Sequence, residues 1–209
     1  FHFQTIKTYS IFVKKAAMDL KRVLESSISL KTLVLNDSKI NAIVEDLSAE
    51  MVSVLNSGGK VLFCGNGGSA ADAQHLAAEL SGRFYYDRPP LAAEALNVNT
   101  SYLTAVANDY SFDEVYARMV NAYGKEGDLL IGISTSGNSN NIVNALKAAK
   151  DKGLKTALLS GATGGKAKQY SEYSILIPSI DTPRIQELHM IIGHTLCEIV
   201  ERTIFPKKI

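Results

Sequence analysis

Residues 60–80 read KVLFCGNGGSAADAQHLAAEL, and three kinds of segment follow one another within them. The first is the apolar run from Val61 to Cys64, which is typical of a short buried strand. A glycine-rich polar loop over residues 65–69 comes next, and the alanine-rich residues 70–80 favour a helix. A strand that passes directly into a helix through such a loop is typical of a parallel α/β sheet.

The same order of segments recurs along the rest of the chain. Apolar stripes at helical spacing predict helices over 38–57 and 183–204, with Asp37 or Ser38 as the first N-cap. Further helices are expected over 112–123 and 140–151, and strands over 60–64, 91–96, 127–133, 155–159 and 174–178. We therefore expect an α/β fold, a three-layer αβα sandwich around a five-stranded, mostly parallel sheet.

The domain organisation is expected to be simple, because no internal repeat or low-complexity linker interrupts the pattern. Residues 38–204 are predicted to form a single domain, and residues 1–37 an N-terminal extension and helix. Met18 could be the native start, so residues 1–17 are expected to be either an added segment or disordered.

Composition excludes several classes of function. Lys and Arg number 22 and Asp and Glu 21, so there is no charge excess to hold a nucleic acid. No apolar run approaches the roughly 18 residues of a membrane span. The two cysteines, Cys64 and Cys197, show no zinc-finger spacing and lie in apolar stretches. We expect buried free thiols, which fit a cytoplasmic protein.

Two polar loops stand at the ends of predicted strands, where ligands of parallel sheets bind. The first is residues 65–69, and the second is STSGNS, residues 134–139. Glycines, hydroxyls and helix N–H groups together suit a phosphate, although Ser and Asn also cap ordinary strand-to-helix turns. Neither loop ends in GKS or GKT, and no GxGxxG occurs, so ATP and dinucleotide binding are not supported.

A possible metal or acid–base cluster comes from two helices. His75 and Glu79 are four residues apart and share a helix face. Gln186 and His194 are eight apart on the closing helix, about 80° around its axis. These residues can converge on one point if the helices face each other. By themselves, however, a His–Glu pair is often solvated and a histidine on an apolar helix often belongs to the core.

Taken together, four runs resemble the sugar isomerase (SIS) domain family and, within it, the phosphoheptose isomerases. The runs are CGNGGSAADAQHLAAELSGRF (64–84), AVANDYSFDEVY (105–116), GDLLIGISTSGNS (127–139) and TPRIQELHMIIGHTLCEIV (182–200). The resemblance extends from about residue 19 to 203. It implies the SIS, flavodoxin-like fold and conversion of sedoheptulose 7-phosphate to D-glycero-D-manno-heptose 7-phosphate, the first step of bacterial ADP/GDP-heptose biosynthesis for lipopolysaccharide or capsule.

The resemblance also implies roles for individual residues. Glu79 and His194 match the family's acid–base pair, and a proton would move between C1 and C2 through an enediolate. The implied zinc ligands, one Zn²⁺ per subunit, are His75, Glu79, Gln186 and His194. Because a carboxylate bound tightly to Zn²⁺ is a poorer base, either Glu79 alternates between ligand and base or the zinc is mainly structural, and the sequence leaves both open. The implied substrate-binding residues are Asn66, Gly67, Gly68, Glu79, Asn108, Asp109, Ser134, Thr135, Ser136, Ser139 and Gln186.

Members of the family are homotetramers whose active sites lie between subunits, so the helices 38–57 and 183–204 are expected to serve in assembly. Two alternatives remain. The chain could isomerise another phosphosugar, such as a pentose 5-phosphate. It could also resemble the non-catalytic relative that binds the bacterial replication initiator and shares the ending CEIVERTIFP. That relative has GNGTS in its first loop and lacks the counterparts of Glu79 and His194, which this chain keeps.

Overall fold

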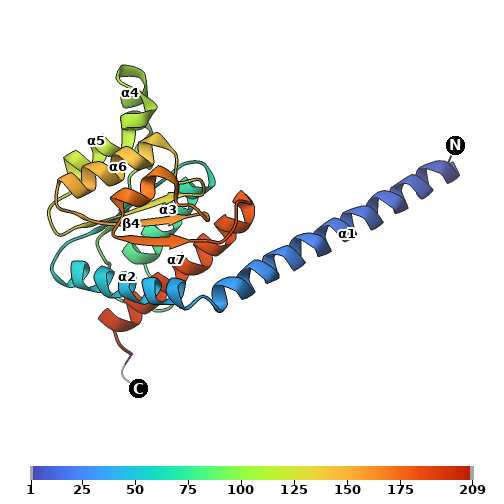
Figure 1. Cartoon of the computed structure of the whole chain (residues 1–209), viewed down its shortest axis with the longest axis horizontal. Helices are drawn as coiled ribbons and strands as arrows, with labels where there is room; N and C mark the ends of the chain where they lie inside the picture. The colour runs from blue at the N-terminus through green and yellow to red at the C-terminus, as the bar shows by residue number, and fades with distance from the viewer. Residues whose placement is uncertain (1, 208–209) are drawn as a thin grey trace.

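The computed structural model describes residues 2–207, with side chains from residue 19 onward. The helix α1 (His2–Leu35) extends away from a compact α/β body and meets it near α2 (Ser38–Asn56) and α7 (Thr182–Ile204) (Figure 1). The expectation that residues 1–17 are an added or disordered segment stays a prediction, since residue 1 and the side chains of residues 2–18 lie outside the described part of the chain.

The sheet has five strands, and all of their pairings are parallel. The strands are β1 (Val61–Gly65), β2 (Ala93–Ala95), β3 (Leu129–Ser134), β4 (Lys155–Ser160) and β5 (Tyr173–Leu176), in the spatial order β2-β1-β3-β4-β5. Gly65 pairs with Ile133 at the carboxyl ends of β1 and β3. The two polar loops therefore leave the sheet side by side, as the sequence predicted for a parallel sheet.

Helices cover both faces of the sheet, which confirms the three-layer αβα sandwich. One face packs on α2, α3 (Gly68–Ser81) and α7, and the other on α5 (Val115–Tyr123) and α6 (Asn140–Asp151). Alternate strand residues supply the two cores, since Phe63 packs in the first and Leu62 in the second. The remaining helices are α4 (Thr100–Asp109) and the 3₁₀ helices η1 (Phe112–Glu114) and η2 (Gly165–Tyr170).

Several local expectations can be compared with the structure. Asp37, and not Ser38, is the N-cap of α2, and its carboxylate accepts the N–H groups of Lys39 and Ile40. Helix α4 was not predicted from the sequence. Cys64 and Cys197 are buried free thiols, as expected. No helix within residues 2–207 is both long enough and apolar enough for a membrane crossing.

Candidate active site

The first polar loop passes from β1 into α3 with glycines where side chains would not fit. Gly67 has φ 55° and ψ −120°, a conformation that glycine adopts readily. A Cβ on Gly65 would lie 2.3 Å from the Ser69 carbonyl oxygen, and one on Gly68 would lie 2.5 Å from Nε2 of Gln186. At Gly68 the backbone of the loop therefore packs directly against the Gln186 side chain, so two of the predicted site residues are in contact.

Asn66, in the same loop, is held by a partner that sequence reasoning missed. Its carboxamide forms two reciprocal hydrogen bonds with the carboxamide of Asn141, at 2.8 and 2.9 Å. Asn141 is buried at the start of α6, just beyond the second loop. The pair therefore ties the two loops together, and no local spacing could have identified it because 75 residues separate its members.

The second loop joins β3 to α6 and is held by its own hydroxyls. Ser134 Oγ lies 3.5 Å from Ser139 Oγ and accepts the N–H of Gly137, and Ser136 Oγ accepts the N–H of Asn138. Beside the loop is a cavity of about 220 Å³. Five of the residues that line it carry a hydroxyl group: Thr135, Ser136, Thr163, Ser179 and Thr182. Only the first two were predicted from the sequence as site residues.

This cavity suits a phosphate held by neutral donors. Hydroxyl groups can donate to the phosphate oxygens, and no Lys or Arg is among the residues that line the cavity. The near-neutral composition of the chain is consistent with such a site, since a single phosphate held by hydroxyl and N–H donors needs no basic surface.

The strongest convergence lies between α3 and α7. Nε2 of His75 is 2.9 Å from Nε2 of His194 and 3.2 Å from Oε1 of Glu79. One ligand atom from each of the three residues lies within 4.8 Å of the others. Two imidazoles and a carboxylate form a donor set that suits Zn²⁺. Three of the four predicted metal ligands are therefore together, and Gln186 lies on the same helix as His194 with its carboxamide against Gly68.

The helices can approach so closely because residue 193 is glycine. A Cβ at Gly193 would lie 2.6 Å from both methyl groups of Leu76, which is the neighbour of His75. Leu76 is itself 2% exposed and has no free space to move into. The glycine thus permits the crossing at which His75 and His194 meet.

His189, whose role the sequence left undecided, lies in the core and not in the cluster. Its Nε2 is 3.3 Å from the carbonyl oxygen of Ser160, at the end of β4. Burial lowers its pKa to about 4, against a smaller opposing effect of that hydrogen bond. The imidazole is therefore neutral at ordinary pH.

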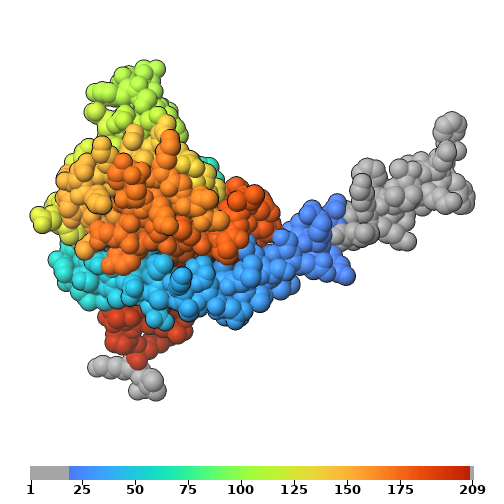
Figure 2. Space-filling view, in the orientation of Figure 1, coloured from blue at the N-terminus to red at the C-terminus, as the bar shows by residue number. Residues whose placement is uncertain are grey.

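Asn108 and Asp109 are not brought to the other predicted residues within one chain. They end α4, where Nδ2 of Asn108 donates to Oδ1 of Asp109 at 2.9 Å, and both are exposed. Figures 1 and 2 show α4 standing out from the body, on the side of the sheet opposite α7. No hydrogen bond among residues 19–207 joins them to the other predicted site residues, and their role stays a prediction.

Comparison with known proteins gives consistent matches over most of the chain. Residues 29–161 match the SIS domain family. Phosphoheptose isomerases of Aneurinibacillus thermoaerophilus and Clostridium acetobutylicum are each 48% identical, over 90% and 89% of this chain and 96% and 95% of theirs. Among solved structures, phosphoheptose isomerases from Neisseria gonorrhoeae and Francisella tularensis superpose with TM-scores of 0.83 and 0.86. They are 39% and 37% identical, over 88% and 90% of this chain and 97% and 98% of theirs.

Proposed function

Because the chain belongs to the SIS domain family and, within it, to the phosphoheptose isomerases, we propose that it converts sedoheptulose 7-phosphate to D-glycero-D-manno-heptose 7-phosphate. The reaction is an aldose–ketose isomerisation and begins the supply of activated heptose for a surface polysaccharide. The observation that carries the proposal is the convergence of His75, Glu79 and His194 beside two loops suited to a phosphosugar.

The two loops divide the binding of the substrate. Ser134, Thr135, Ser136 and Ser139 hold the phosphate with hydroxyl and backbone N–H donors at the start of α6. Gly67 and Gly68 present a side-chain-free backbone to the sugar beside Asn66, so that C1 and C2 of the sugar can lie close to α3 and α7. Gln186, packed against Gly68, supplies a carboxamide to the same region.

Glu79 and His194 carry out the proton transfers. The Glu79 carboxylate abstracts a proton from one carbon and returns it to the neighbouring carbon through a cis-enediolate. His194 exchanges the proton of the adjacent oxygen. His75 contacts Oε1 of Glu79, which fixes the direction of the carboxylate and leaves Oε2 for the sugar.

The donor set also supports binding of one zinc ion per subunit by His75, Glu79, Gln186 and His194. When bound, Zn²⁺ would supply a Lewis acid that polarises the sugar carbonyl. Elemental analysis of the purified protein tests this part separately. We expect about one zinc per chain, lost in His75→Ala, and a protein without stoichiometric zinc would contradict it.

The central test compares the wild type with Glu79→Gln in an assay with sedoheptulose 7-phosphate. Loss of general-base catalysis is expected to lower kcat by about 10²- to 10⁴-fold while KM changes little. Glu172→Gln is the control, since it removes a half-exposed carboxylate that pairs with Lys155 away from the site. An inactive wild type, or preference for a pentose 5-phosphate, would contradict the proposed substrate.

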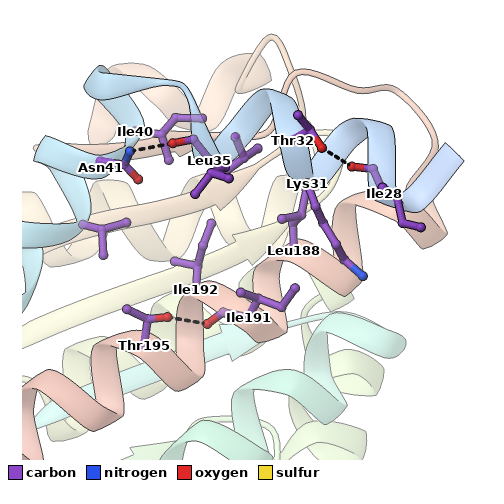
Figure 3. Close-up of a pocket in the computed structure, with 12 residues that line it drawn as sticks. Ile28, Lys31, Thr32, Leu35, Ile40, Asn41, Leu188, Ile191, Ile192 and Thr195 are labelled. Atoms are coloured by element: carbon purple, nitrogen blue, oxygen red, sulfur yellow. Dashed lines mark hydrogen bonds between the residues drawn. The ribbon is translucent and has the colours of Figure 1, made fainter. Parts of the chain in front are cut away.

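A homotetramer is the second part of the proposal, and an apolar groove supports it. The groove, about 520 Å³, lies between α1, α2 and α7, and Figure 3 shows Ile28, Leu35, Ile40, Leu188, Ile191 and Ile192 around it. Large apolar side chains of α1 remain exposed, including Leu24 at 52% and Leu33 at 60%. Such a surface is typical of a contact between protein chains.

Assembly would also explain the position of Asn108 and Asp109. They stand on a projecting helix, away from their own chain's loops, and could complete the site of a neighbouring subunit. The two buried free thiols, Cys64 and Cys197, support a cytoplasmic location for the enzyme.

A further inference from the structure

A buried ion pair lies at one end of the α3–α7 contact, outside the residues assigned to the site. Arg88, in the segment between α3 and β2, has a side chain that is only 2% exposed. It donates from Nη2 to the carbonyl oxygen of Glu79 at 2.8 Å, and from Nη1 to those of Leu80 and Gly82 at 2.7 and 3.0 Å. Glu79 and Leu80 belong to the last turn of α3, and Gly82 is its C-cap residue. Carbonyls at this end of a helix have no partner within the helix, and Arg88, together with the N–H of Leu91 on Leu80, supplies partners from outside it, so Arg88 caps the helix that carries Glu79.

Glu201 of α7 is the partner of Arg88 and is completely buried. Its carboxylate accepts Nε of Arg88 at 3.1 Å and the backbone N–H groups of Phe84 and Tyr85 at 2.9 and 2.8 Å. Burial by itself would raise the pKa of Glu201. The three donors outweigh burial, so the net pKa lies below its usual value and the group stays ionised.

Arg88 and Glu201 are attached to the same two helices as Glu79 and His194. Glu201 follows His194 by seven residues, two helical turns, and therefore lies on nearly the same face of α7. Arg88 bonds the backbone of Glu79 and the side chain of Glu201 at the same time. It thus connects the turn that holds Glu79 with the helix that holds His194.

A buried ion pair is a weak source of stability, because the cost of removing both charges from water is comparable to their attraction. An apolar pair could have filled the same space. What an apolar pair could not do is fix the last turn of α3 by directional hydrogen bonds to its carbonyls. The arrangement is therefore better suited to setting a position than to holding the chain folded.

We propose that Arg88 and Glu201 are positioning residues of the isomerase, which set the last turn of α3 against α7 so that Glu79 and His194 face the same substrate atoms. The inference rests on the proposed function. Displacement of a catalytic group by about 1 Å can cost 10²-fold in rate. No hydrogen bond or ion pair among residues 19–207 joins the second loop, residues 134–139, to Arg88 or Glu201, so the pair should influence kcat and leave substrate affinity nearly unchanged.

The test compares Glu201→Gln with Asp128→Asn. The two carboxylates are matched, since Asp128 is also buried, also accepts two backbone N–H groups and also pairs with one cation, Lys60. Asp128 lies at the opposite end of the sheet, where β3 begins. We expect Glu201→Gln to lower kcat at least tenfold with KM within about twofold. Asp128→Asn should leave kcat within about twofold of the wild type even where it lowers the melting temperature as much.

Arg88→Lys provides a second variant, because Lys keeps the charge but cannot reach Glu201 and the α3 carbonyls together. If Glu201→Gln does not fold, Arg88→Lys takes its place in the comparison with Asp128→Asn, and the same fall in kcat is expected. Equal kcat losses in Glu201→Gln and Asp128→Asn, or a fall confined to KM, would overturn the inference. An inactive wild type would instead contradict the proposed function. In that case a crystal structure of Glu201→Gln decides: an unchanged separation of Glu79 and His194 overturns the positioning role, and an increased one supports it.

Discussion

At the scale of single residues, His189 shows how its surroundings set the charge of a side chain. It is fully buried on the side of α7 that faces β4, its Nε2 donates to the Ser160 carbonyl, and its Nδ1 has no hydrogen-bond partner among residues 19–207. Protonation would place a charge in the core, so burial lowers the pKa from about 6.5 to about 4. The folded protein therefore keeps this imidazole neutral where the unfolded chain would protonate it.

This difference makes stability depend on pH in a known direction. Between pH 6.5 and 4 the unfolded chain binds more protons at His189, so the contribution present above pH 6.5 is lost as the pH falls. The loss from pH 7 to pH 5 is about 2 kcal/mol. Urea unfolding at both pH values should show this loss in the wild type and not in His189→Gln, whose amide can donate to Ser160 without titrating. Equal pH dependence in the two proteins would show that His189 does not carry the effect.

The sequence could identify those site residues whose chemistry is local. His75 and Glu79 are four apart on one helix, and the four hydroxyl residues of the second loop lie within six positions, 134–139, so their spacing predicts their meeting. Glu201 and Arg88 lie 113 positions apart, and Asn66 and Asn141 lie 75 apart. Such pairs form only when elements far apart in the sequence pack together, so a short sequence pattern cannot predict them.

At the scale of elements, the candidate site depends on how α3 crosses α7. Besides the His75–His194 contact, Gly68 packs against Gln186 and Leu76 against Gly193, and Arg88 joins the end of α3 to Glu201. His75 and His194 are the immediate neighbours of Leu76 and Gly193. The separation of the helices at that point therefore sets the distance between the imidazoles.

Gly193→Ala should widen this crossing. In a free helix the change would stabilise the protein by about 1 kcal/mol, because Ala is the better helix former. Here the added methyl meets Leu76 at 2.6 Å, and overpacking of a core usually costs about 1–3 kcal/mol. We expect a net loss of about 1 kcal/mol in urea unfolding, together with a lower kcat. A gain in stability with unchanged kcat would show that the crossing tolerates the methyl group.

Helices with a long apolar stripe were predicted correctly, and the short helix α4 was missed. The stripe of α2 includes Leu47, Met51 and Val54, all buried as its spacing predicts. In α4 only Val106 is buried, and the apolar residues that pack beside it on the second core cover little more than one turn, which is too short a pattern to predict a helix. Its N-cap Asn99, which accepts the N–H of Tyr102, was the single local indication.

At the scale of the whole molecule, two surfaces are incomplete in a single chain. The groove between α1, α2 and α7 exposes apolar side chains to water, with Ile28 at 62% and Ile191 at 45%. On the other side of the sheet, the projecting helix α4 ends at Asn108 and Asp109, and both side chains are exposed. One assembly of several copies could both cover the groove and bring α4 to a neighbouring site.

Ile191→Glu tests this link between assembly and activity. A carboxylate in an apolar contact between copies would be costly to bury, so in analytical ultracentrifugation the variant should sediment as a smaller species than the wild type. Because Asn108 and Asp109 would then lack a neighbouring site, kcat/KM should fall at least tenfold while the circular dichroism spectrum is unchanged. Tyr123→Glu is the control, since Tyr123 is 58% exposed at the end of α5, in the opposite layer, and should leave both properties intact. A wild type that sediments as a monomer would show that the groove is not a contact between copies. An Ile191→Glu variant that sediments like the wild type and is fully active would show that neither assembly nor activity depends on the groove.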